Sequence, residues 1–86
     1  MHRDIKCENI LFITEQDGQI ILKLTDFGES CKVNENTNEI IGTDFYRANE
    51  IDCAFKYGEK ADCYSLGVVL HVLLTEDLPW KTKEEW

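Results

Sequence analysis

Short apolar runs separated by polar stretches divide the chain into a few predicted elements. Ile10–Ile13 and Ile20–Leu24 are β-prone runs, and the polar stretch between them contains Asp17 and Gly18. Two such runs on either side of a turn sequence are typical of a β-hairpin, here with a loop longer than the tightest kind. The pattern therefore predicts an antiparallel hairpin over residues 10–24.

A second pattern predicts a helix from about Lys60 to Thr75. Acidic Glu59 and Asp62 lie at its start, where the helix dipole favours negative charge, and Pro79 follows its end. Apolar side chains fall on nearly every side of this helix. Because a helix that is apolar all round is normally buried all round, we expect it to need more cover than the rest of the chain supplies.

The stretch from residue 26 to about residue 43 is polar and rich in turn-forming residues. We expect a long surface loop here. Loops of this length without regular structure are usually functional or disordered.

Composition and charge narrow the classes of function. The chain has 86 residues, of which 43% are hydrophobic, so it fits one globular unit at most, or a part of one, and not a disordered chain. Its net charge of −8 argues against nucleic acid and anionic membranes as main partners. The longest apolar run, Leu66 to Leu74, is too short to span a bilayer. We interpret the acidic surface as solvated, with recognition of basic peptides as the weaker alternative.

The cysteines of the chain, at positions 7, 31, 53 and 63, are predicted to be free thiols. No two of them have the C-x-x-C spacing of a zinc site or a redox motif, and the chain does not open with a secretory signal peptide. We therefore expect an intracellular, cytoplasmic protein in a reducing compartment.

The predicted hairpin brings together side chains that carry oxygen ligands. Asn9 precedes its first strand and Asp26 follows its second, and antiparallel pairing places these two ends side by side. An amide oxygen and a carboxylate at one place suit a hard cation such as Mg²⁺. Asp4 and Lys6 lie in the loop leading to this place, where a carboxylate can accept a hydroxyl proton and a lysine can neutralise phosphate oxygens. The set is what phosphoryl transfer from a magnesium nucleotide needs.

These residues occur in the motifs HRDIKCEN (2–9) and DFG (26–28). The motifs resemble the catalytic loop and the metal-binding triplet of eukaryotic protein kinases. GTDFYRANE (42–50) resembles the end of the family's activation segment, and DCYSLGVVL (62–70) resembles its central buried helix. The resemblance covers essentially the whole chain, in the family's order and spacing.

The resemblance implies an α+β fold that forms part of a protein kinase large lobe, with the small lobe absent. Its implied parts are a catalytic loop (2–9), a hairpin (10–24), an activation segment (26–50) and a buried central helix (about 60–75).

The resemblance also implies catalytic and binding roles. Asp4 corresponds to the catalytic base that orients the substrate hydroxyl, and Lys6 to the residue that contacts the γ-phosphate in serine/threonine kinases. Asn9 and Asp26 correspond to the magnesium ligands. Leu11 corresponds to a residue under the adenine ring of ATP.

Other implied roles are structural. Thr43 corresponds to a threonine that bonds back to the base and the lysine, which is a further mark of serine/threonine specificity. Asp62 corresponds to the residue that holds the catalytic-loop backbone. The remaining matches are His2 and Phe27 in the hydrophobic stack of the active state, Gly28 in the DFG triplet, and Glu50, whose usual partner is an arginine of a later helix.

Arg3 precedes the implied base, and arginines at this place commonly bind a phosphorylated residue of the activation segment. The usual phosphorylated position, three residues before Gly42, is occupied by Glu39. We expect its carboxylate to bond to Arg3 in place of a phosphate, so that activation needs no phosphorylation there. The alternatives are a solvated Glu39 and a true phosphorylation site at Thr37.

The implied function is that of a serine/threonine protein kinase that uses ATP and Mg²⁺ to phosphorylate protein or peptide substrates, without nucleic acid or membrane partners. Cys7, Asp44 and Asn49 stand where the family usually has proline, which loosens the backbone but removes no catalytic group. The alternative is a non-catalytic pseudokinase or a kinase-derived interaction module. A small-molecule phosphotransferase is more distant, because Lys6 and GTDFY (42–46) speak against it.

We expect the 86 residues by themselves to be inactive and at best marginally folded. The groups that hold ATP from the small lobe are not encoded in them, and phosphoryl transfer depends mostly on positioning.

Overall fold

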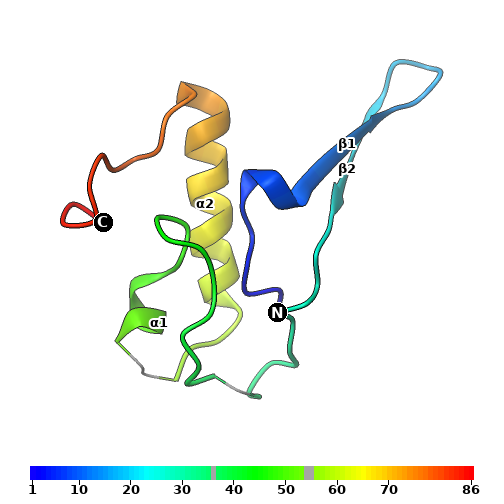
Figure 1. Cartoon of the computed structure of the whole chain (residues 1–86). Coiled ribbons are helices and arrows are strands. Elements are labelled where there is room, and N and C mark those ends of the chain that lie inside the picture. The colour runs from blue at the N-terminus through cyan, green and yellow to red at the C-terminus, as the bar shows by residue number, and fades with distance from the viewer. Residues whose placement is uncertain (36, 54–55) are drawn as a thin grey trace.

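The computed structural model describes residues 1–35, 37–53 and 56–86. It is a small α+β arrangement in which β1 (Ile10–Thr14) and β2 (Ile20–Leu24) form an antiparallel hairpin that projects away from the long helix α2 (Lys60–Thr75) (Figure 1). The other described elements are a 3₁₀ helix, η1 (Cys7–Asn9), and the short α1 (Asn49–Asp52). The predicted hairpin and the predicted helix are both confirmed.

The hairpin turn follows from its own residues. Ile10 lies opposite Leu24 in the register of the two strands. At the turn Gly18 adopts φ 85°, a left-handed conformation that glycine accepts readily, and its amide donates to the Glu15 carbonyl at 2.9 Å. The Asp17 carboxylate accepts a backbone amide hydrogen bond of 3.0 Å inside the same turn. Local chemistry therefore fixes the register, and with it the position of the residues that flank the strands.

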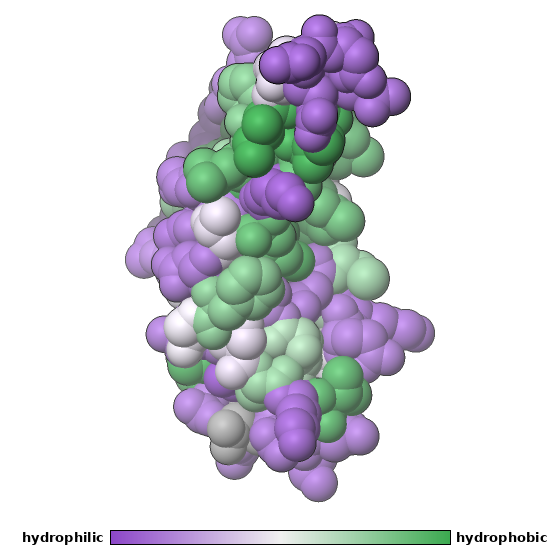
Figure 2. Space-filling model, turned by 90° about the vertical axis from the view of Figure 1, so that its right-hand side faces the viewer, coloured by the Kyte–Doolittle hydropathy of each residue, from purple (hydrophilic) through white to green (hydrophobic). Residues whose placement is uncertain are grey.

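The hairpin is apolar on both faces, and both faces are exposed. Phe12 and Leu22, which pair across the strands, are 71% and 66% exposed. Ile13 points to the opposite face and is also exposed. Figure 2 views the molecule from the side of the hairpin, where hydrophobic residues gather in the upper half of the surface.

Helix α2 buries one stripe and exposes another. The buried stripe, at helical spacing, consists of Ala61, Ser65, Val68 and Val69. The exposed stripe consists of Leu66, Leu70, Leu73 and Leu74, each more than half exposed. The helix ends at Glu76, whose backbone is left-handed at φ 61° and whose amide donates to the Val72 carbonyl at 2.7 Å. The expected all-round apolar helix is therefore present, and the described residues cover one side of it.

The core is correspondingly small. One cluster packs Ile5 and Tyr46 against Val68 and Val69, and a second packs Ala48, Ile51 and Tyr57 against Ala61. The accessible surface is 6071 Å², whereas a compact monomer of 10.0 kDa has about 5,200 Å². The molecule thus presents more surface than its mass requires.

Two further observations bear on the class of protein. All four cysteines are free, as the sequence predicts. None of the helices in the described part of the chain has the length and apolar character needed to cross a membrane.

Candidate functional site

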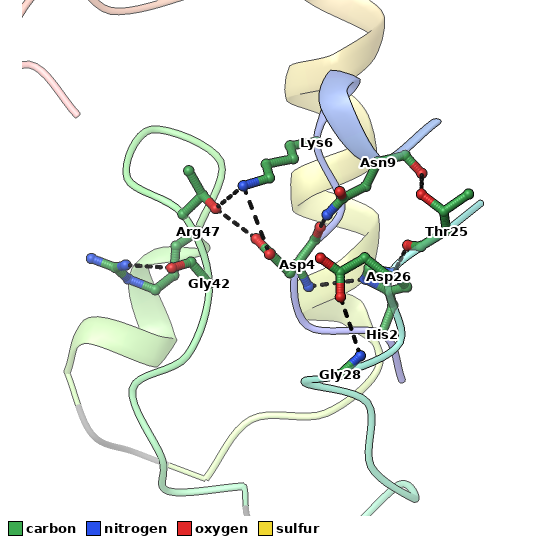
Figure 3. Close-up of polar contacts among 10 residues, drawn as sticks. His2, Asp4, Lys6, Asn9, Thr25, Asp26, Gly28, Gly42 and Arg47 are labelled. Atoms are coloured by element: carbon green, nitrogen blue, oxygen red, sulfur yellow. Dashed lines mark hydrogen bonds and ion pairs between the residues drawn. The ribbon is translucent and has the colours of Figure 1, made fainter. Parts of the chain in front are cut away.

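Three side chains from two distant segments meet at the centre of the site. Lys6 Nζ donates to Thr43 Oγ1 at 3.0 Å, and Thr43 Oγ1 donates to Asp4 Oδ1 at 2.6 Å. Figure 3 shows the side chains of Lys6 and Asp4 pointing toward one another at this place. Lys6 Nζ also lies 3.8 Å from the other carboxylate oxygen of Asp4. The side chains of Asp4 and Lys6 are 16% and 22% exposed, so both remain within reach of a ligand. One hydroxyl therefore fixes a potential proton acceptor next to a cation.

The backbone before Asp4 is held by Asp62 of α2. The Asp62 carboxylate accepts the amide of His2 at 2.7 Å and the amide of Arg3 at 2.9 Å. Arg3 has φ 74°, a left-handed conformation that a non-glycine residue adopts only where its surroundings enforce it. Hydrogen bonds to a charged acceptor are among the strong ones, and here they stabilise that strained turn.

His2 connects the loop to the end of the hairpin. Its Nε2 lies 2.8 Å from the Thr25 carbonyl, and its Nδ1 accepts the Asp4 amide at 3.1 Å. Because a carbonyl can only accept, Nε2 carries the proton and Nδ1 is bare, which selects one neutral tautomer. The His2 ring also meets Phe27 edge-on, with ring centroids 5.2 Å apart, so the pair expected to stack is in contact.

Asn9 and Asp26 flank the base of the hairpin, as the register predicts. The Asn9 carbonyl accepts the Thr25 amide at 2.8 Å. It also accepts the Thr25 hydroxyl at 3.1 Å, so Asp26, the next residue, lies close to Asn9 (Figure 3). Asn9 Nδ2 donates to the Asp4 carbonyl at 2.9 Å, so its amide oxygen remains available. Asp26 has φ 60°, and its exposed carboxylate accepts the Gly28 amide at 3.4 Å.

This donor set fits Mg²⁺. An amide oxygen and one carboxylate are hard oxygen ligands, and Mg²⁺ usually keeps several waters and binds through few protein groups. The described residues contain no cluster of three or more His, Cys, Asp and Glu side chains that could hold a metal.

The guanidinium of Arg3 is buried and joins several segments. Its Nε donates to the Glu29 carbonyl at 2.6 Å, its Nη1 donates to the Tyr57 hydroxyl at 3.3 Å, and Nη1 lies 3.9 Å from Glu39 Oε1. The side chain of Arg3 is 5% exposed and that of Glu39 is 46% exposed. Burial lowers the pKa of Arg3, but the hydrogen bond to Tyr57 and nearby negative charge, including Glu39, outweigh it, so the pKa is raised. The guanidinium of Arg3 therefore stays positively charged.

Comparison with known proteins fits this geometry. Residues 1–86 match the family model described as the protein kinase domain. This chain belongs to the protein kinase family. It is 43% identical over 75 residues to the serine/threonine-protein kinase CG17528 of Drosophila melanogaster, which is 86% of this chain and 10% of that protein. It is 45% identical over 85 residues to testis-specific serine/threonine-protein kinase 5 of Mus musculus, which is 94% of this chain and 22% of that protein.

The kinase chain thus spans between a tenth and a quarter of the length of these two relatives. Protein kinases generally use ATP and Mg²⁺ and act on protein substrates.

Some residues singled out in the sequence lie outside the central contacts. Leu11 is on β1 and is 54% exposed. Glu50 is in the first turn of α1 and forms no ion pair within the described ranges. Thr37 is buried, and its carbonyl accepts the Tyr57 amide at 3.2 Å, so its hydroxyl is a poor target for a phosphorylating enzyme in this conformation.

Sequence reasoning missed a charged cluster beside Thr43. Arg47 Nη2 lies 3.1 Å from Asp44 and 2.9 Å from Asp52, and its guanidinium stacks 5.1 Å from the Trp86 ring centroid. Lys83 pairs with Asp44 at 2.8 Å, and the hydrogen bond from Lys83, helped by Arg47, lowers the pKa of Asp44. From the sequence, only the ion pair between Asp44 and Arg47 could have been expected, because these residues are three positions apart.

Ser65 and Tyr57 were also missed. The Ser65 hydroxyl donates to the Tyr46 carbonyl at 2.7 Å and so attaches α2 to the segment after Thr43. The sequence signal for Ser65 was a single polar residue among the apolar positions of the helix.

Burial raises the pKa of Tyr46 to about 12, which keeps that phenol neutral. Tyr57 had no signal, because a single aromatic residue between two helices has no periodicity.

Proposed function

We propose that the chain carries the catalytic centre of a serine/threonine protein kinase, which transfers the γ-phosphoryl group of ATP to serine and threonine hydroxyls of proteins. The observation that carries the proposal is the Thr43 hydroxyl, which bridges Asp4 at 2.6 Å and Lys6 at 3.0 Å. A base and a cation held by one hydroxyl suit a reaction in which a substrate hydroxyl loses its proton while phosphate charge shifts.

In this proposal each residue of the site has a separate role. Asp4 orients the incoming hydroxyl and accepts its proton, and Lys6 neutralises charge on the phosphoryl oxygens. Asn9 and Asp26 would hold Mg²⁺, and Leu11 would contact the adenine base. Bound Mg–ATP supplies the phosphoryl group and the positive charge that the transfer requires.

The same proposal assigns segments and specificity. Residues 2–9 are the catalytic loop, residues 26–50 the activation segment and residues 60–75 the central helix; residue 36 lies outside the described residues. Lys6 and Thr43, together with serine/threonine kinases as relatives, support transfer to serine and threonine. The free cysteines fit a reducing, cytoplasmic location.

The test is a phosphotransfer assay with the full-length protein that contains this chain, on a peptide library that offers serine, threonine and tyrosine. We expect phosphate on serine and threonine and a loss of about 10²–10⁴ in kcat for Asp4→Asn. Asp17→Asn makes the same chemical change on the exposed hairpin turn and should keep wild-type turnover. Phosphate mainly on tyrosine, or near wild-type turnover of Asp4→Asn, contradicts the proposal and favours the non-catalytic alternative.

The magnesium assignment has its own test. Asp26→Asn should weaken Mg–ATP binding, because it replaces a charged ligand with a neutral one. Unchanged nucleotide affinity and activity would count against the assignment.

A further inference from the structure

Tyr57 is a buried tyrosine whose backbone and side chain both bind the loop before Gly42. Its amide donates to the Thr37 carbonyl at 3.2 Å, and its hydroxyl donates to the Glu39 carbonyl at 2.6 Å. The residue is 5% exposed. This loop segment is therefore attached to Tyr57 at two points.

The ring of Tyr57 is held in place from the other side. It belongs to the cluster formed with Ala48, Ile51 and Ala61, so α1 and α2 fix the ring. A ring that is packed between two helices places its hydroxyl at a defined position, because few side-chain rotamers remain open to it.

The hydroxyl of Tyr57 also reaches the segment that carries Asp4. It accepts a hydrogen bond from Arg3 Nη1 at 3.3 Å while it donates to Glu39. Arg3 is the residue directly before Asp4 and has the left-handed backbone described above. One phenol therefore connects the side chain of the residue before Asp4 to the loop backbone at Glu39, and the hydroxyl both donates and accepts a hydrogen bond.

We propose that Tyr57 is a positioning residue for phosphoryl transfer, whose hydroxyl couples the orientation of Arg3, and through it Asp4, to the placement of the loop at Glu39. This inference rests on the proposed kinase function. Tyr57→Phe keeps the packed ring and removes the coupling atom, which leaves the Glu39 carbonyl and one Arg3 N–H without this partner.

The first measurement is steady-state kinetics of the full-length protein. We expect Tyr57→Phe to lower kcat for peptide about tenfold, the size that follows from the loss of one hydrogen bond to a charged group, with the KM for ATP nearly unchanged. Tyr64→Phe is the matched control, since Tyr64 lies on α2 and stacks on Trp80 at 6.1 Å between ring centroids, and it should keep wild-type kinetics. Equal kcat values for wild type and Tyr57→Phe would overturn the proposal.

A double-mutant cycle separates positioning from plain loss of structure. If Tyr57 acts through Arg3, the Tyr57→Phe change should have almost no further effect on kcat in an Arg3→Met background. Arg3→Lys, which keeps the charge and loses the planar fork, replaces Arg3→Met if that variant does not fold. The same tenfold loss in both backgrounds would mean that Tyr57 does not act through Arg3.

Failure of the proposed function can be told apart from failure of this inference. If the wild-type protein phosphorylates no peptide, the proposed function is wrong, and the coupling is then measured by hydrogen exchange. Tyr57→Phe should speed exchange of the amides from Thr37 to Ile41, and the increase should vanish in the Arg3→Met or Arg3→Lys background. Unchanged exchange in Tyr57→Phe would overturn the coupling itself.

Discussion

The polar network around Asp4 differs from the apolar surfaces of the hairpin and α2 in how many of its groups have partners within the chain. Within the described residues, every buried side-chain nitrogen and oxygen has a hydrogen-bond partner. By contrast, Phe12 on the hairpin and Leu74 on α2 are 71% and 77% exposed. The polar side chains of the proposed site therefore have their hydrogen-bond partners, whereas the burial that stabilises a domain is only partly supplied.

The difference matters because the two regions contribute differently to free energy. A typical hydrogen bond contributes about 0.5–1.5 kcal/mol net, so the network mainly fixes geometry. Fully burying one leucine side chain contributes about 1.5–3 kcal/mol. The free energy gained by covering the exposed stripe of α2 is thus comparable to the whole unfolding free energy of a small domain, about 5–15 kcal/mol.

The largest effect is expected at Asp62, where the two regions meet. Asp62→Ala removes the acceptor of the His2 and Arg3 amides and releases the strained turn before Asp4. Hydrogen bonds to charged groups contribute about 1.5–3 kcal/mol each, so we expect the full-length protein to lose about 3–6 kcal/mol of unfolding free energy in denaturant melts. Asp52→Ala, in which an exposed carboxylate paired with Arg47 is lost, is the control and should lose less than about 1 kcal/mol. Equal losses in both variants would show that the network does not depend on α2.

A smaller effect, and one that depends on context, is expected on the exposed stripe of α2. Where further sequence of the full-length protein covers the helix, Leu70→Ala should lower the unfolding free energy by about 2–5 kcal/mol. In residues 1–86 alone the same change should lower self-association, because Leu70 is exposed there. Lys81→Ala is an exposed control for both measurements. A Leu70→Ala variant of the full-length protein that is as stable as wild type would mean that this stripe is not covered.

These elements also show what the sequence could predict. The hairpin could be predicted from its two apolar runs and from Gly18 in the turn, and α2 from its apolar pattern. Both predictions succeed because these elements are determined by residues that are close together in the sequence. The meeting of Asp4, Lys6 and Thr43 was expected only through the family resemblance. The contacts of Tyr57 could not be foreseen, because they join Arg3 and Glu39, which are brought together only by the tertiary fold.

The smallest effect is expected at Glu39. Its carboxylate is half exposed and lies 3.9 Å from Arg3, and exposed ion pairs contribute about 0.2–1 kcal/mol. Glu39→Gln should therefore reduce kcat of the full-length protein by about 1.4- to 5-fold. Phosphatase treatment should leave wild-type activity unchanged, because the expectation is that Glu39 replaces a phosphate.

Thr37→Val provides the matched control for Glu39, because it removes the rival phosphate acceptor. It should retain activity, in keeping with the burial of Thr37. Loss of activity both on phosphatase treatment and in Thr37→Val would identify Thr37 as the regulatory site. Full activity of Glu39→Gln would show that the ion pair between Glu39 and Arg3 has no role in activity.

The contrast between the satisfied polar network and the exposed apolar faces is tested most directly with residues 1–86 alone. Thermal unfolding and Mg–ATP binding are measured on the same purified sample. The account predicts no cooperative unfolding transition and no nucleotide binding at micromolar concentrations, because the exposed faces of β1, β2 and α2 leave too little burial to hold the network in place. A cooperative transition in a soluble monomer, together with micromolar nucleotide affinity, would contradict it.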